Sequence, residues 1–217
     1  MSPSSPPPAS ASPAAFNSDE TLLGRYREGD EGAFAKLYHR HRAGLYRFIR
    51  GLSSNSAHAD EVFQETWLAL IRSEAVPDGR ARFKTWLFQI ARHRLIDCWR
   101  KHKGENMQSE AFDKENSLPI ETGAHAPETP ETLLLRTEQL QHIAAALETL
   151  PLPQREVFLL RAHADMELSE IAALTETSLE ATKSRYRYAL AKLRHNLLST
   201  PTKKTSPPLD MEANTPP

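Results

Sequence analysis

The 217-residue sequence predicts an all-α protein with two small helical domains joined by a flexible acidic linker. Apolar residues recur at helical spacing in two blocks, residues 18–103 and 131–198. Between them, residues 104–130 contain Pro119, Pro127 and Pro130, carry mostly acidic charge and show little periodicity, which is typical of a linker without fixed structure. The two blocks show no internal repeat, so we expect two different domains. The ends, residues 1–17 and 199–217, are rich in Pro and small or polar residues and are predicted to be disordered.

Four helices are expected in the first domain. They cover about residues 17–28, 31–52, 57–73 and 83–103. Asn17, followed three residues later by Glu20, is typical of a helix start. Asp60 and Glu61 lie in the first turn of the third helix, where carboxylates suit the helix dipole. The sequence Pro77-Asp-Gly predicts a turn before the fourth helix.

The second domain is expected to begin with a helix over residues 131–149 that stops before Pro151. Pro153 suits the first turn of the next helix. Residues 168–179 then predict a helix, a tight turn and a second helix, with Ser178 as the N-cap of the second. This pattern is typical of a DNA-binding helix-turn-helix, and the alternative is an ordinary helical hairpin with a charged outer face. Glu176 occupies a turn position where many such motifs have Gly, because a left-handed conformation costs other residues roughly 1 kcal/mol.

Charge is strongly segregated although the net charge is only -1. Residues 80–103 carry eight Lys or Arg against Asp97 alone, and residues 105–131 carry seven acidic residues against Lys114 alone. Such asymmetry indicates an anionic partner for the first segment. The acidic segment either mimics or repels nucleic acid, or is simply solvated.

The segment 83–103 mixes cations with aromatic rings, among them Trp86, Phe88 and Trp99. Cations bind phosphate, and exposed rings stack on unpaired bases, so this helix is expected to handle nucleic acid, in particular a single strand. The alternative is a well-packed helix whose long cationic side chains lie over a solvated face.

Several classes of protein are excluded or disfavoured. Cys98 is the only cysteine, so an internal disulfide is impossible and a reducing compartment is expected. No stretch is long and apolar enough to span a membrane, and the N-terminus lacks a secretory signal, so we expect a cytoplasmic protein. We find no HExxH motif, phosphate loop or nucleophile elbow, and we predict no enzyme activity and no cofactor. The nine histidines are interpreted as solvated, His102 without an acidic or Cys partner at ligand spacing, and no metal site is predicted.

Three segments together resemble the extracytoplasmic-function sigma factors, the small (group IV) members of the bacterial sigma-70 family. Residues 59–68, ADEVFQETWL, are similar to region 2.2 of that family. Residues 83–100, FKTWLFQIARHRLIDCWR, are similar to regions 2.3 and 2.4. Leu150-Pro, then REVFLLR at 155–161, Ile171-Ala and Lys183-Ser-Arg are similar to region 4. The resemblance runs from about Thr21 to Leu198 and includes neither tail.

This resemblance implies a non-catalytic specificity subunit that binds core RNA polymerase and directs it to promoter DNA. The implied contacts with the polymerase β′ clamp helices come from Asp60, Glu61, Gln64 and Glu65. The implied contacts with the −10 element come from Phe83, Lys84, Trp86, Gln89, Arg92, His93, Asp97, Arg100 and Lys101. The implied contacts with the −35 element come from Lys183, Ser184, Arg185 and Arg187. The family also implies a contact with the polymerase β flap and, commonly, an anti-sigma factor as partner.

The sequence departs from the family pattern at a few positions. His93 replaces an Asn found in many members, and Glu180-Ala replaces a frequent Gly-Thr, so base preferences at the two promoter elements do not transfer. A stand-alone helix-turn-helix regulator is the alternative function. It would leave the aromatic residues of segment 83–103 and the acidic residues 60–65 without a purpose.

Overall fold

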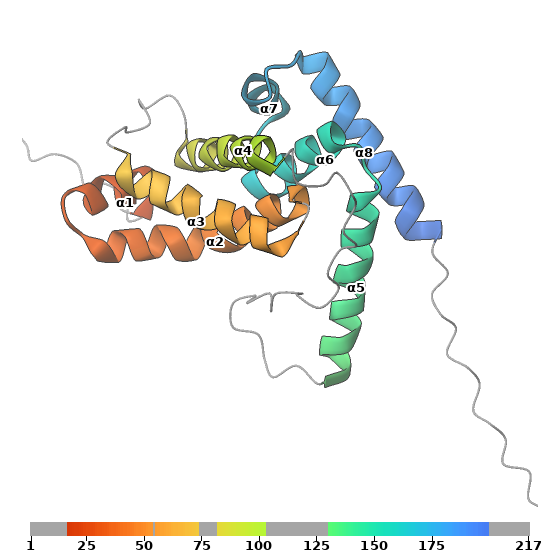
Figure 1. Ribbon diagram of the computed structural model, residues 1–217, viewed down its shortest axis with the longest axis horizontal. Helices are drawn as coiled ribbons and strands as arrows, with labels where there is room; N and C mark the ends of the chain where they lie inside the picture. Colours follow the sequence, from red (N-terminus) through yellow and green to blue (C-terminus); the bar gives the residue numbers. More distant parts are fainter. Residues whose placement is uncertain (1–16, 54, 74–81, 103–129, 200–217) are drawn as a thin grey trace, which may run out of the picture.

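The computed structural model describes residues 17–53, 55–73, 82–102 and 130–199, and these residues confirm the all-α prediction, with no strand among them. The helices are α1 (Asp19–Arg27), α2 (Glu31–Leu52), α3 (Ser56–Arg72), α4 (Phe83–His102), α5 (Pro130–Glu148), α6 (Leu152–Leu159), the π-helical turn η2 (Leu160–Ala164), α7 (Leu168–Leu174) and α8 (Leu179–Ser199) (Figure 1). The expected disordered tails fall outside the described residues, except for their innermost residues 17 and 199. The expected linker does too, except for Pro130, which is the first residue of α5. No helix in the described part of the chain is long and apolar enough to cross a membrane.

Side-chain caps fix where the first three helices begin. Asp30 accepts a hydrogen bond from the Ala33 N–H at the start of α2, and Asn55 does the same for α3. The cap of α1 is Ser18, whose hydroxyl accepts from the Thr21 N–H at 3.2 Å. The prediction of Asn17 as this cap is therefore wrong by one residue, because Ser18 places Asp19 in the first turn, where a carboxylate suits the helix dipole.

The first domain is formed by α1 to α4. In Figure 1, α2, α3 and α4 run beside one another, and α1 packs on α2 and α4. Its core includes Leu37, Phe48, Leu70 and Leu95, all at most 1% exposed. Burial of these side chains at about 25 cal/mol per Å² is the main force that holds the helices together.

The second domain, α5 to α8, packs directly on the first. Val157, Leu159 and Leu160 are buried in the same apolar cluster as the core of the first domain. A Cβ atom on Gly51 of α2 would lie 2.7 Å from a methyl carbon of Leu159, so any other residue there would require the Leu159 side chain to shift. The two domains are thus joined by a shared core as well as by the chain between them.

The helix-turn-helix is formed by α7 and α8. Ser178 caps α8 as predicted, accepting from the Ala181 N–H at 3.1 Å. Glu176 has a φ of 55°, so the turn does adopt the left-handed conformation expected there. The hydroxyls of Thr175, Thr177 and Thr182 form a chain of hydrogen bonds of 2.9–3.1 Å that ties the turn to α8.

Candidate functional site

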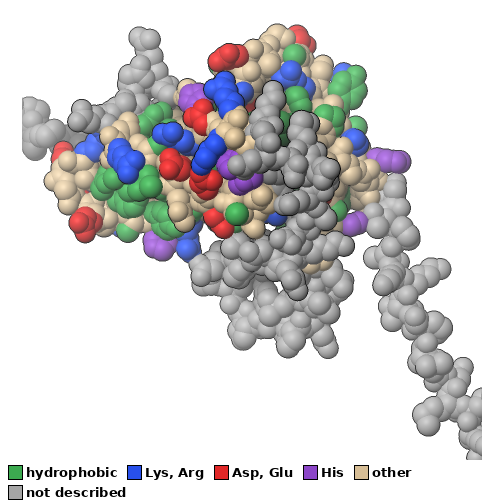
Figure 2. Space-filling model, viewed as in Figure 1, with side chains coloured by type: hydrophobic (Ala, Val, Ile, Leu, Met, Phe, Trp, Pro, Cys, Tyr) green, Lys and Arg blue, Asp and Glu red, His purple; other side chains and the backbone are tan. Residues whose placement is uncertain are grey.

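One side of α3 carries the four residues predicted to contact a protein partner. Asp60, Glu61, Gln64 and Glu65 are all exposed, whereas Ala59, Val62, Thr66, Trp67 and Leu70 bury the opposite side of the helix. We call the four exposed residues the acidic face of α3. Figure 2 shows acidic and basic side chains alternating over α3 and α4.

Two of these carboxylates have partners within the protein. Asp60 accepts a hydrogen bond of 2.8 Å from the Tyr46 hydroxyl, and burial together with this bond raises the pKa of Tyr46 to about 12. Glu61 accepts from the Lys101 ammonium at 3.0 Å, and this bond lowers the pKa of the Glu61 carboxyl. The intramolecular partners hold these two carboxylates in place beside Gln64 and Glu65.

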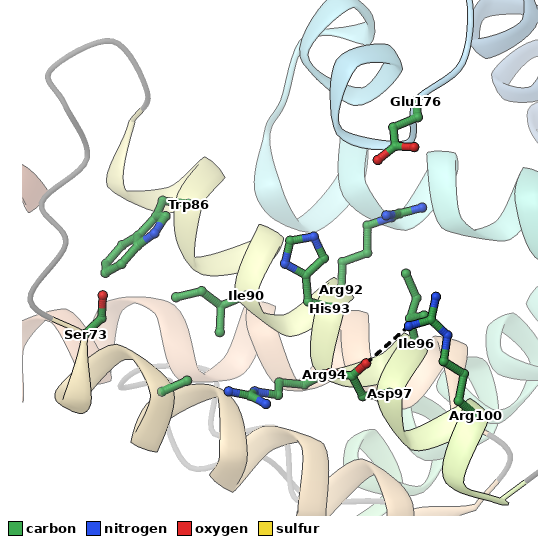
Figure 3. Close-up of a pocket in the computed structure, with 11 residues that line it drawn as sticks. Ser73, Trp86, Ile90, Arg92, His93, Arg94, Ile96, Asp97, Arg100 and Glu176 are labelled. Carbon is green, nitrogen blue, oxygen red and sulfur yellow. Dashed lines mark ion pairs between the residues drawn. The ribbon is translucent and has the colours of Figure 1, made fainter.

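A hollow of about 740 Å³ opens beside α4 (Figure 3). It is lined by Trp86, Ile90, Arg92, His93, Arg94, Ile96, Asp97 and Arg100 of α4, Ala69 and Ser73 at the end of α3, and Glu176 of the helix-turn-helix. A ring, several cations and an aliphatic floor meet in one place. This combination can bind an unstacked base and its phosphates.

The structure separates the nine residues predicted to contact the −10 element into groups. Five of them line the hollow: Trp86, Arg92, His93, Asp97 and Arg100. Gln89 is exposed on α4 outside this lining. Lys84 faces a second, smaller cavity of about 280 Å³, and Lys101 points to Glu61.

Phe83 is the exception, because it is fully buried. Its ring lies 5.3 Å from that of His41, and its backbone N–H donates to the Glu20 carboxylate at 3.1 Å. Phe83, Leu87 and Ala91 recur every four residues on the buried side of α4. The prediction of a DNA contact by Phe83 is therefore wrong, and its role is to anchor the start of α4 in the core. Phe88 is buried as well, with its ring 5.2 Å from that of Phe48, so it offers no stacking surface.

The sequence did not indicate all the residues of the hollow. Arg94 lies one helical turn before Asp97 and Ile90 lies two turns before it, so helical spacing could have found them. Ala69, Ser73 and Glu176 belong to other elements, and only the packing of α3 and of the helix-turn-helix around α4 brings them there.

Arg92 is part of the interface between the two domains. Its Nε donates to the Glu156 carboxylate of α6 at 2.9 Å, and both side chains are less than one fifth exposed. Figure 3 shows the Arg92 side chain extending toward the side of the hollow where Glu176 lies. In this arrangement one N–H of the guanidinium, at Nε, is bound to a carboxylate that offsets its charge.

The outer side of α8 carries the four residues predicted to read duplex DNA. Lys183 and Arg187 are exposed, and Ser184 and Arg185 are half-buried. Lys183 donates to Glu180 at 2.8 Å, which offsets its charge, and the Arg187 guanidinium lies 5.5 Å from the centroid of the Tyr188 ring. The surface therefore offers two Arg and a hydroxyl near the N-terminal half of an exposed helix, the part of a recognition helix that reads base edges.

Comparison with known proteins shows which family the chain resembles. Residues 37–105 match the family model for Sigma-70 region 2, and residues 146–195 match that for Sigma-70 region 4. The sequence is 30% identical to the RNA polymerase sigma factor NccH of Alcaligenes xylosoxydans xylosoxydans over 182 residues, which cover 84% of this chain and 96% of the relative. It is 27% identical to the ECF RNA polymerase sigma factor SigX of Bacillus subtilis over 168 residues, or 77% of this chain and 84% of SigX.

Solved structures agree. The structure of CnrH in complex with the cytosolic domain of CnrY matches with a TM-score of 0.53 and 26% identity, covering 82% of this chain and 96% of that one. The sigma factor RpoE of Bartonella quintana, in complex with the anti-sigma factor NepR, matches with a TM-score of 0.54 and 25% identity, covering 76% and 97%.

The chain therefore belongs to the sigma-70 family of RNA polymerase sigma factors. Within that family it is an extracytoplasmic-function sigma factor, a specificity subunit that initiates transcription by RNA polymerase.

Proposed function

We propose that the acidic face of α3 binds core RNA polymerase at the β′ clamp helices, and that region 4 contacts the β flap. The observation that carries this proposal is the packing of α3 against α4, which sets an exposed acidic surface beside the hollow with its ring and cations. Contact with the polymerase on one helix would place the neighbouring helix against the DNA that the polymerase opens. The clamp and flap assignments rest on the family resemblance.

The hollow beside α4 is proposed to hold the −10 element as an opened strand. Trp86 supplies a ring for stacking, His93 a hydrogen-bonding imidazole, and Arg100 a cation for phosphate. Lys84, Gln89, Arg92, Asp97 and Lys101 remain in the proposed set, and Phe83 leaves it because it is buried. The chain carries out no chemistry itself in this proposal, since the polymerase supplies the active site.

The outer side of α8 is proposed to read the −35 element as duplex DNA. Arg185 and Arg187 suit the acceptors of guanine or hold phosphates, and Ser184 suits several bases. In this proposal both domains contact promoter DNA. The first domain binds an opened strand beside α4, and the second binds duplex DNA through α8.

An anti-sigma factor is proposed as a further partner in the cytoplasm. RpoE was solved with the anti-sigma factor NepR bound, and CnrH was solved with the cytosolic domain of CnrY bound. The acidic face of α3 is the surface such a partner would cover, because covering it would keep the polymerase away.

The test of this function is copurification with core RNA polymerase, followed by run-off transcription on a pool of upstream fragments. Stoichiometric binding and transcripts with defined start sites are expected. Sequence-specific duplex binding without polymerase binding would instead favour a stand-alone regulator and overturn the proposal.

A charge reversal tests the polymerase surface directly. Glu65→Lys should weaken holoenzyme assembly about tenfold or more, because a like charge set against a complementary surface costs a kcal/mol or more. Glu28→Lys, an exposed reversal at the end of α1, is the matched control. Equal assembly by the two variants would remove the α3 assignment, and unchanged binding of −35 duplex by Glu65→Lys would show that the variant is folded.

A further inference from the structure

Three side chains with metal-binding atoms meet where the start of α3 lies against the end of α4. They are His58 of α3 and Cys98 and His102 of α4, and one ligand atom from each lies within 4.8 Å of the other two. The interpretation of His102 as a histidine without a Cys partner at ligand spacing is wrong. Cys98 precedes it by four residues, which is one helical turn and places both on the same side of α4.

The geometry is close to that of a bound metal ion. The Cys98 sulfur lies 3.5 Å from Nδ1 of His102, and the rings of His58 and His102 are 4.1 Å apart between centroids. Around a tetrahedral zinc ion with bonds of about 2.0–2.3 Å, neighbouring ligand atoms are roughly 3.5 Å apart. Nδ1 of His102 also lies 2.9 Å from the Cys98 carbonyl oxygen, so a metal would either displace this hydrogen bond or bind His102 through Nε2 after rotation of its ring.

The donor set defines the class of ion. One thiolate and two imidazoles favour zinc and similar borderline or soft transition metals, whereas calcium and magnesium require oxygen ligands. Cys98 is buried, 8% exposed, while the two histidines are half-buried, so the cluster can be reached from solvent and is still partly shielded from it.

Glu61 is the acidic residue whose charge acts on the cluster. It follows His58 by three residues on α3, and its charge acts on the Cys98 thiol and on both imidazoles. A cysteine binds a metal as its thiolate, so the Cys98 proton would pass to solvent as a sulfur–metal bond forms.

We propose that His58, Cys98 and His102 form a binding site for a zinc-like divalent transition metal, with water or the Glu61 carboxylate as the fourth ligand. The ion would tie α3 to α4 at one end. Glu61 also belongs to the acidic face of α3, so a metal that drew its carboxylate away from Lys101 would alter that face. This consequence for the polymerase rests on the proposed function, while metal binding itself does not.

Cobalt is the probe for this site, because a Co²⁺ ion bound by a thiolate gives a sulfur-to-metal charge-transfer band in the near ultraviolet. The full-length, tag-free protein is freed of metal under reducing conditions and titrated with Co²⁺, then with Zn²⁺ as competitor. A 1:1 charge-transfer band that Zn²⁺ abolishes is the expected result. No band, or a band that does not saturate at one equivalent, would overturn the proposal.

Variants identify the ligands. Cys98→Ser should abolish the band, and His58→Ala should weaken cobalt binding by more than the roughly 10–100-fold typical for loss of an outer-shell group. His195→Ala, which removes an exposed histidine of α8, should leave the titration unchanged. Cys98 is buried, so the Cys98→Ser variant can fail to fold. In that event the test rests on His58→Ala, because His58 is only half-buried. Wild-type affinity in folded His58→Ala would overturn the site.

Discussion

Glu176 is a residue in which local conformation and function compete. Its φ of 55° places a side chain with a Cβ in the left-handed region, in the turn between α7 and α8. The backbone is held there because the N–H of Thr177 donates to the Ala172 carbonyl at 2.9 Å. The Glu176 side chain also lines the hollow beside α4, so the turn of one domain reaches the candidate −10 surface of the other.

Glycine at this position should stabilise the protein. Glu176→Gly is expected to raise the free energy of unfolding by about 0.5–1 kcal/mol, since Gly adopts positive φ without the steric cost of a Cβ but loses more chain entropy on folding. Glu176→Ala is the control, because it removes the same carboxylate and keeps the Cβ. Urea unfolding of the two variants measures the difference, and equal midpoints would show that the turn is unstrained.

For single residues, the sequence is informative about features that the local backbone determines, such as helix caps and turns. The cap at Ser178 was predicted and is present. Glu176, which is not the Gly favoured at this turn position and so counted against the motif, nevertheless adopts the left-handed conformation. Phe83 was misassigned, because an aromatic residue among cations fits a stacking surface and a core anchor equally well. Only the register of α4 against α2 decides between the two.

Among the elements, α8 carries the most direct test of DNA recognition. Arg187→Ala should weaken promoter-dependent transcription by the holoenzyme and lower the slope of its salt dependence by about one phosphate contact. Arg194→Ala is the matched control, since it removes another exposed cation two turns further along the same helix. Run-off transcription across a salt series gives both quantities. Equal salt slopes for wild type and the Arg187 variant would contradict a phosphate or base contact.

The helices themselves were predictable, and their irregular joint was not. Apolar spacing and capping residues predicted most helix limits to within a few residues, because both signals are local. The π-helical turn η2, Leu160–Ala164, follows α6, and no Gly or Pro in this segment predicts the irregularity. It ends at Asp165, which has a φ of 55°. Its cause is tertiary, since Leu160 and Ala164 are both buried in the core shared with the first domain.

At the scale of the whole molecule, the two domains were predicted and their close packing was not. Val157 and Leu159 are apolar residues that could belong to the second domain's own core, and nothing in the sequence shows that they join the core of the first domain, where Leu159 lies against Gly51. The ion pair of Arg92 with Glu156 adds a charged contact to this interface. Only the Nε of Arg92 donates to Glu156, so promoter binding through Arg92 either uses the remaining N–H groups of the guanidinium or requires this contact to open.

His163 makes the domain interface sensitive to acid. Burial against the first domain, with the charges of Arg47 and Lys84, lowers the pKa of His163 to about 4. Asp19, Arg40 and His41 line the same cavity. The Asp19 carboxylate, hydrogen-bonded to His41 and Arg40, has a lowered pKa and stays ionised as the pH falls toward 5. When the domains separate, His163 returns to water and to a pKa near 6.5.

The separated state therefore binds more protons than the packed one between pH 6.5 and 4, and packing is lost as the pH falls through this window. At pH 5 the loss amounts to about 2 kcal/mol. Small-angle scattering of the full chain should show the radius of gyration rising between pH 7 and pH 5 while helical circular dichroism is retained. His163→Asn, which cannot take up a proton, should remove most of this rise. An equal expansion in wild type and variant would assign the acid response to other groups and leave His163 a neutral packing residue.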